Sequence, residues 1–160
     1  MSRVTCKDRL PEHYKGRITD LRELWHADSH PREECRVCKG TGKIGPYGCE
    51  YCEEGRYSED GHLNEYGLAF DYVAPGTFGD QRRGYWRYQL GWGGPSDEFR
   101  FYCDEGRRPV RVEYWFLDWF DGAHRTLRAG KDFDLLMNLW SWFDDVGAVE
   151  HSYAQAAADA

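Results

Sequence analysis

Residues 85–117 read YWRYQLGWGGPSDEFRFYCDEGRRPVRVEYWFL, and aromatic or aliphatic side chains recur in them at nearly every second position. A period of two is typical of β-strands with one buried face, because successive side chains point to opposite faces. Glycine, proline and aspartate interrupt the pattern at 93–97 and again at 104–109, which predicts two turns. With a further alternating run at 68–73, the pattern predicts four strands. Short turns between neighbouring strands imply an antiparallel meander.

A helical pattern follows the predicted strands. Over residues 131–146 the apolar side chains repeat at steps of three and four and cover so much of the helix that it must lie against the sheet. Gly147 is the expected end of this helix. We therefore expect an α+β fold: an antiparallel β-meander of about four strands, a C-terminal helix packed on it, and a small N-terminal hairpin module.

The expected domain organisation has four parts. Residues 1–30 are interpreted as an irregular N-terminal segment with a short helix, because Pro11 and Gly16 interrupt it. Residues 31–57 form a cysteine module, and residues 67–150 form the sheet with its helix. The alanine-rich residues 151–160 are expected to be a frayed tail.

Four cysteines of the cysteine module form two closely spaced pairs, Cys35 with Cys38 and Cys49 with Cys52. Two residues between cysteines let both sulfurs of a tight turn face one point. Two such turns supply the tetrahedral four-sulfur set that Zn²⁺ takes. Glycines between the pairs allow the backbone to bend around the metal. The spacing thus predicts a structural zinc site with these four cysteines as ligands.

Residues 35–42 match the Cys-x-x-Cys-x-Gly-x-Gly repeat of the cysteine-rich domain of DnaJ-type chaperones, and residues 49–55 are similar to a second copy. The second copy has Glu-Glu-Gly where the family has x-Gly-x-Gly. The resemblance implies one zinc ion on a β-hairpin-like unit. It is limited to this module, and His30-Pro31 is followed by arginine where the J-domain of the family has aspartate. The resemblance therefore carries the metal geometry and does not imply co-chaperone activity.

Two roles are open for the zinc module. A four-cysteine shell leaves no position for water, so a catalytic zinc is not expected. The module is either a folding staple or an interaction knuckle that displays Arg36, Val37, Tyr47 and Tyr51. A third hypothesis is single-stranded nucleic-acid binding, because lysines and arginines lie beside the two tyrosines. Glutamates in the same segment nearly cancel their charge, so we rank this hypothesis last.

The formal net charge is −7, and residues 57–160 hold eighteen acidic against ten basic side chains. An acidic body repels phosphate, so direct nucleic-acid binding by this part is not expected. No apolar run approaches the roughly 20 residues of a membrane helix. The first residues lack the apolar stretch of a secretory signal. We therefore expect a cytoplasmic protein with reduced cysteines and no membrane partner.

From these features we expect a non-catalytic, zinc-stabilised protein that binds a protein with a basic surface. Its size and acidity resemble those of proteins that phages and plasmids encode to inhibit host defences or nucleic-acid-handling complexes, some of which imitate the charge of DNA. The candidate binding residues are eight carboxylates: Asp97, Glu98, Asp104, Glu105, Asp118, Asp121, Asp144 and Asp145.

The alternative is a hydrolase in which the zinc is only structural. Glu113, Asp118 and Asp121 lie among tryptophan and phenylalanine residues near the end of the fourth predicted strand. An apolar wall raises the pKa of a carboxylate, which a hydrolase uses for acid catalysis. Spacing alone does not establish that these carboxylates converge. Of the two remaining cysteines, Cys103 is interpreted as a buried, inert thiol, while Cys6 lies in a polar segment and has no histidine beside it.

Overall fold

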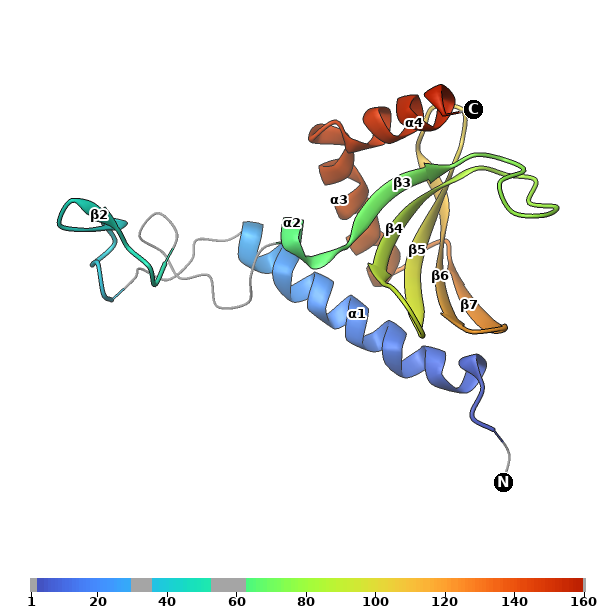
Figure 1. Cartoon of the computed structure of the whole chain (residues 1–160), viewed down its shortest axis with the longest axis horizontal. Coiled ribbons are helices and arrows are strands. Elements are labelled where there is room, and N and C mark those ends of the chain that lie inside the picture. Colours follow the sequence, from blue (N-terminus) through green and yellow to red (C-terminus); the bar gives the residue numbers. More distant parts are fainter. Residues whose placement is uncertain (1–2, 30–35, 53–62, 160) are drawn as a thin grey trace. The chain divides into compact units, whose positions relative to one another are not determined.

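The computed structural model describes residues 3–29, 36–52 and 63–159 (Figure 1). The chain divides into two compact units, one made of Met1–Ile18 with Gly67–Ala160 and the other of Thr19–Tyr66. Helix α1 (Cys6–Ser29) begins in the first unit and ends in the second. Among the described residues, no helix combines the length and the apolar character that crossing a membrane requires.

The larger unit is built on a five-stranded antiparallel sheet in the order β3-β4-β5-β6-β7. Neighbouring strands place aromatic side chains opposite each other, since Phe99 pairs with both Tyr88 and Tyr114. The sheet confirms the predicted α+β class and the antiparallel meander. Its strands are β3 (Ala69–Val73), β4 (Tyr85–Gly91), β5 (Ser96–Cys103), β6 (Pro109–Asp118) and β7 (Asp121–Leu127).

The fifth strand, β7, is absent from the predicted meander. It lies at the edge of the sheet, and Leu127 is its only buried residue. The strand forms because the turn at Trp119 and Phe120 returns the chain along β6, where Asp118 pairs with Asp121. An alternation of apolar and polar residues cannot reveal a strand that has so few apolar side chains.

Two C-terminal helices, α3 (Lys131–Asp145) and α4 (Ala148–Ala158), lie on one face of the sheet (Figure 1). The ring of Trp140 lies 5.4 Å from the ring of Trp86 and 5.3 Å from that of Phe101. One turn later, Phe143 stacks on Phe70 at 4.1 Å. These contacts confirm the predicted C-terminal helix, and they place the core between α3 and the sheet.

The prediction of a frayed tail is wrong, because residues 148–158 form α4. Gly147 has a φ of 83° and redirects the chain between the two helices. Val149 is buried, and its carbonyl accepts a hydrogen bond of 3.2 Å from Nε1 of Trp86. Alanine has the highest intrinsic helix propensity, and this contact with the sheet holds the alanine-rich helix in place.

The expected irregular N-terminal segment is likewise wrong for residues 6–29, which form α1. Thr5 and Asp8 cap its start reciprocally: the Asp8 amide donates to Thr5 Oγ1 at 3.3 Å, and the Thr5 amide donates to Asp8 Oδ2 at 2.9 Å. Pro11 and Gly16 lie inside the helix without ending it. The buried side chains recur at steps of three and four: Cys6, Leu10, Tyr14, Ile18, Leu21 and Leu24.

The smaller unit contains the second half of α1, a short hairpin of β1 (Lys43–Ile44) and β2 (Tyr47–Gly48), and the single-turn helix α2 (Leu63–Tyr66). The hydroxyl of Tyr66 donates a hydrogen bond of 2.7 Å to Asp20 in α1. This contact ties α2 to the helix, within the same unit as the hairpin.

Candidate metal centre

The hairpin brings the ends of the cysteine module together. Lys43 pairs with Gly48, and Ile44 pairs with Tyr47. The pairing continues one step outward, where the amide of Cys49 donates to the carbonyl of Gly42 at 2.9 Å. Cys49 is therefore held opposite the turn that follows Cys38, although ten residues separate the two cysteines.

The turn after Cys38 has the conformation that a metal-binding loop requires. Lys39 and Gly40 have positive φ angles of 54° and 79°, which reverse the chain within two residues. The amide of Gly42 then donates to Sγ of Cys38 at 3.2 Å. An N–H group that points at sulfur favours the negatively charged thiolate, which is the form that binds a metal.

Thr41 supports this turn, and cysteine spacing alone did not single it out. Its hydroxyl lies 2.7 Å from the carbonyl of Cys38 and 2.9 Å from that of Lys43, and the amide of Lys43 lies 3.2 Å from the same hydroxyl. A hydroxyl between two carbonyls and an amide holds the loop in the conformation that brings Gly42 N–H to the sulfur of Cys38. The only sequence signal for this role is the position of Thr41 between the glycines of the repeat.

The sulfur atoms of Cys38, Cys49 and Cys52 all lie within 4.8 Å of one another, and those of Cys38 and Cys52 are 3.5 Å apart. Four sulfurs around a zinc ion with bonds of about 2.3 Å are separated by about 3.8 Å. The three cysteines are thus close enough to hold a metal ion. The fourth predicted ligand, Cys35, lies outside the described residues.

The eight predicted binding carboxylates do not form one exposed face. Asp97 and Glu98 are only 4% and 3% exposed. Asp97 accepts two hydrogen bonds from the guanidinium of Arg17, at 2.7 and 2.9 Å, and one from the hydroxyl of Tyr114 at 2.7 Å. Glu98 accepts one of 2.8 Å from Arg100. Both carboxylates therefore belong to the interior of the larger unit.

Three more of these carboxylates have structural partners. Asp118 forms an ion pair of 2.6 Å with Arg9 in α1. Asp121 accepts a hydrogen bond of 2.7 Å from the Cys6 amide at the start of the same helix, and this bond lowers the pKa of Asp121. Asp104 accepts the amides of Gly106 and Arg108 within the β5–β6 turn. The remaining three, Glu105, Asp144 and Asp145, are exposed.

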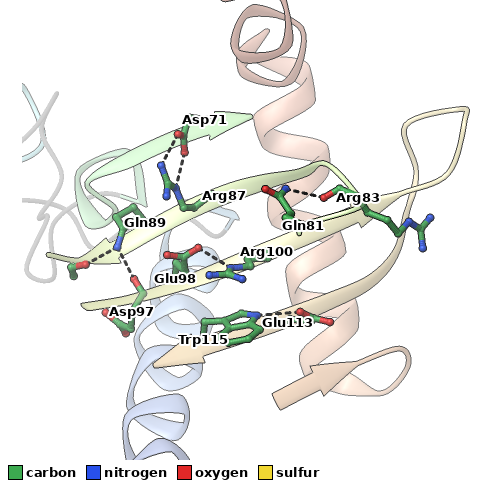
Figure 2. Close-up of polar contacts among 11 residues, drawn as sticks. Asp71, Gln81, Arg83, Arg87, Gln89, Asp97, Glu98, Arg100, Glu113 and Trp115 are labelled. Atoms are coloured by element: carbon green, nitrogen blue, oxygen red, sulfur yellow. Dashed lines mark hydrogen bonds and ion pairs between the residues drawn. The ribbon is translucent and has the colours of Figure 1, made fainter. Parts of the chain in front are cut away.

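Of the three carboxylates of the hydrolase alternative, Asp118 and Asp121 lie opposite each other at the β6–β7 turn, and Glu113 lies apart from them. Asp118 and Asp121 hold α1, whereas Glu113 lies on the sheet face that points away from the helices. On that face Glu113 accepts a hydrogen bond of 3.0 Å from Trp115 (Figure 2) and another of 3.0 Å from Arg111. A pair of acids for hydrolysis has to flank one bond of the substrate, and Glu113 is not placed to form such a pair with Asp118 or Asp121.

The face that carries Glu113 is a layer of aromatic rings and guanidinium groups, of which Figure 2 shows Trp115, Arg87 and Arg100. Arg100 lies 4.2 Å above the ring of Trp115, and Trp115 stacks on His124 at 4.4 Å. Across the sheet, Arg87 pairs with Asp71 at 2.7 Å. Both arginines offset a carboxylate, and Arg100 also lies over an aromatic ring, so the layer covers the sheet with its own side chains.

The two cysteines outside the module have the properties of inert thiols. Burial raises the pKa of Cys103 to about 12. Burial also raises the pKa of Cys6, and the carboxylate of Asp121 adds to this effect. A thiol with a raised pKa forms little of the reactive thiolate. The described geometry therefore supports the inert interpretation of Cys103 and extends it to Cys6.

No family model matches the chain, and neither a curated protein nor a solved structure is similar enough to it to indicate a relationship. The resemblance to DnaJ-type zinc repeats thus rests on the spacing of the cysteines and glycines. The geometry adds the convergence of Cys38, Cys49 and Cys52.

Proposed function

We propose that this chain is a zinc-stabilised, non-catalytic protein-binding protein, in which the cysteine hairpin serves both as a folding staple and as a contact surface. The observation that carries the proposal is the convergence of three cysteine sulfurs on a hairpin whose apolar side chains face solvent. The function combines a metal site with a binding surface, and the two are supported by different residues.

Zinc is the metal that suits this site best. Thiolates select soft metals such as zinc, copper(I) and iron–sulfur clusters. Two Cys-x-x-Cys turns with Cys35 as the fourth ligand supply a closed tetrahedral set, which is the arrangement of structural zinc sites. Such a shell has no open position for water, so zinc here has no direct role in catalysis.

The hairpin needs a metal to be stable. Its strands have two residues each, and all four of these residues are exposed. An isolated two-stranded hairpin is at best marginally stable in water. Metal binding contributes about 10–16 kcal/mol to folding in small zinc modules. We propose that zinc supplies the stability that the hairpin cannot obtain from a core.

A staple alone does not explain the apolar surface of the hairpin. Ile44 and Tyr47 face each other across the two strands and are 47% and 76% exposed, and Tyr51 is 63% exposed. Tyrosine is enriched at the centres of protein interfaces. We propose that these three side chains, called the hairpin patch below, contact a partner protein.

We also propose that the partner has a basic surface, because the larger unit has exposed carboxylates that would attract it. This acidic contribution is reduced to Glu105, Asp144 and Asp145, because the other carboxylates are buried or engaged. An imitation of the charge of DNA would need a larger array of free carboxylates. The proposal therefore does not include it.

Metal content and partner capture test the proposal with three variants. Cys49→Ser removes a ligand. The double variant Tyr47→Ser/Tyr51→Ser removes the two tyrosines of the hairpin patch but no ligand, and Asp144→Lys/Asp145→Lys reverses exposed charges. Zinc would be measured by plasma mass spectrometry, and partners would be captured from host-cell lysate. We expect one zinc per chain in the wild type and in the tyrosine variant, and less than half of that in Cys49→Ser.

The partner-capture experiment shows whether the hairpin is a contact surface or only a folding staple. We expect the tyrosine variant to keep its zinc and lose the partner, and the charge reversal to weaken capture most at low salt. A tyrosine variant that captures the partner as the wild type does would contradict the contact role of the hairpin. Tight binding of a single-stranded oligonucleotide that depends on Tyr47 and Tyr51 would favour the nucleic-acid hypothesis instead.

A further inference from the structure

A group of exposed aromatic side chains lies at one end of the five-stranded sheet, on the turns that join β4 to β5 and β6 to β7. Trp92 is 78% exposed, Trp119 is 82% exposed and Phe120 is fully exposed. A β-carbon on Gly94 would lie 3.6 Å from Nε1 of Trp119, so the two turns touch each other. We call Trp92, Trp119 and Phe120 the end patch. Figure 1 shows both turns beside the start of α1.

The end patch is held on a rigid frame. Asp118 precedes it and pairs with Arg9 at 2.6 Å, and Asp121 follows it and accepts the Cys6 amide at 2.7 Å. The β6–β7 turn is therefore fixed to α1 on both sides of its two aromatic residues. The backbone of a turn on such a frame loses little conformational freedom when a partner binds.

Trp119 occupies a backbone conformation that normally belongs to glycine, asparagine or aspartate. Its φ is 56°, in the left-handed region, and it sits in the two-residue turn between Asp118 and Asp121. Turns of this kind favour small residues, because a bulky side chain is strained there. A strained and exposed tryptophan does not stabilise the turn. Its role is therefore sought in a contact outside the chain.

The size and charge of the end patch indicate which kind of partner surface could cover it. Three aromatic side chains at these exposures present roughly 500–600 Å², about two thirds of the roughly 800 Å² that each partner contributes to a stable protein interface, an area that suits a weak dimer. Arg9 offsets the charge of Asp118, and Asp121 keeps its negative charge but interacts with the positive charge of Arg3. The patch thus presents apolar area without a net local charge that would oppose an identical patch.

We propose that the end patch is a self-association surface, on which two copies of this chain meet through a two-fold axis. In such an interface the same patch buries itself against its counterpart, so no second complementary surface is needed. The rest of each copy carries most of the net charge of −7, and these charges repel across the dimer. Added salt screens that repulsion and strengthens the dimer, opposite to its effect on a contact with a basic partner.

Analytical ultracentrifugation of the full-length chain tests this proposal, from about 1 to about 500 µM, a range that covers weak dimers. We expect a concentration-dependent dimer in the wild type that strengthens when salt is raised. Trp119→Gly should weaken it at least about thirtyfold, the size expected of a central aromatic residue. The matched control is Phe78→Ser, which removes an exposed aromatic side chain from the β3–β4 loop and should leave the dimer unchanged.

Thermal unfolding of the same variants separates a contact role from a structural one. Because glycine accepts a φ of 56° without strain, Trp119→Gly should unfold at the same temperature as the wild type or a higher one, measured at a concentration where both are monomeric. A wild type that stays monomeric at every concentration and salt would overturn the proposal and leave another kind of partner as the occupant. A dimer that Trp119→Gly does not weaken would overturn it as well. The end patch and the hairpin patch carry separate variants, so failure of one proposal does not affect the other.

Discussion

At the scale of single residues, one carboxylate links α1 to the sheet of the larger unit. Asp97 lies in β5 with a side chain that is almost fully buried, and it receives Arg17 from α1 and Tyr114 from β6. Two charge-assisted hydrogen bonds from one guanidinium fix both distance and orientation. The helix is thereby held at a defined position against strands that lie 80 residues away in the chain.

Loss of the Asp97 charge should destabilise the protein more than loss of a comparable exposed charge. We expect Asp97→Asn to lower the free energy of unfolding by about 2–3 kcal/mol, because the guanidinium of Arg17 would keep its partly buried position without a counter-charge. The control is Asp71→Asn, which breaks the more exposed pair with Arg87 and should cost less than about 1 kcal/mol. Urea unfolding measures both. Equal losses would show that the Asp97 contact is no stronger than a surface pair.

At the scale of secondary-structure elements, one glycine lies inside a helix and another lies at the junction between two helices. Gly16 lies inside α1, and an added β-carbon would meet nothing within 4 Å. Gly147 lies between α3 and α4 with a φ of 83°, and an added β-carbon there would also meet nothing. The two positions therefore differ in backbone conformation and not in available space.

Alanine substitutions at these glycines should change stability in opposite directions. Gly16→Ala should raise the free energy of unfolding by about 0.5–1 kcal/mol, because alanine has the higher helix propensity. Gly147→Ala should lower it by about 1–2 kcal/mol, since a left-handed conformation strains any residue with a β-carbon. Thermal and urea unfolding of the two variants provide the comparison. A stabilising Gly147→Ala would contradict the left-handed junction.

The elements that could be predicted from the sequence are those whose buried faces are apolar. Strands β4, β5 and β6 and helix α3 show their period directly in tryptophan, tyrosine, phenylalanine and leucine. A short helix is predicted within residues 1–30, but the full length of α1 is not, because its buried face contains Cys6 and Tyr14 and because Pro11 and Gly16 indicate interruptions. Its position depends on contacts with residues far along the chain, which a local pattern does not contain.

The sequence predicts the metal ligands of the candidate site better than its acidic binding residues. The pairs of cysteines have a short-range spacing that reflects the geometry of metal coordination, and Cys38, Cys49 and Cys52 converge as that spacing predicts. The predicted acidic face includes Asp97 and Glu98, which are buried, because charge in a sequence does not show which carboxylates are paired. Asp97 and Asp118 find their arginines in α1, about 80 and 110 residues earlier.

At the scale of the whole molecule, the interior of the larger unit is rich in tyrosine. Burial is the largest cause of a raised pKa at Tyr72, Tyr85, Tyr102 and Tyr114, whose ordinary value is 10.0. At Tyr114 the hydrogen bond to the Asp97 carboxylate raises the pKa further. These hydroxyls keep their protons in the folded protein at a pH where the unfolded chain has lost them.

This difference makes the protein sensitive to alkaline pH. Above about pH 10 the unfolded state binds fewer protons than the folded state, so the free energy of unfolding falls as the pH rises. Each tyrosine whose pKa is raised contributes up to about 1.4 kcal/mol per pH unit between its unfolded and folded values. We expect urea unfolding between pH 9 and pH 11.5 to show this fall, and Tyr114→Phe to reduce its slope by up to that amount. Tyr47→Phe, which changes an exposed tyrosine of the other unit, should retain the slope of the wild type. A stability that does not change over this range would show that the tyrosines of the sheet reach water more freely than their burial indicates.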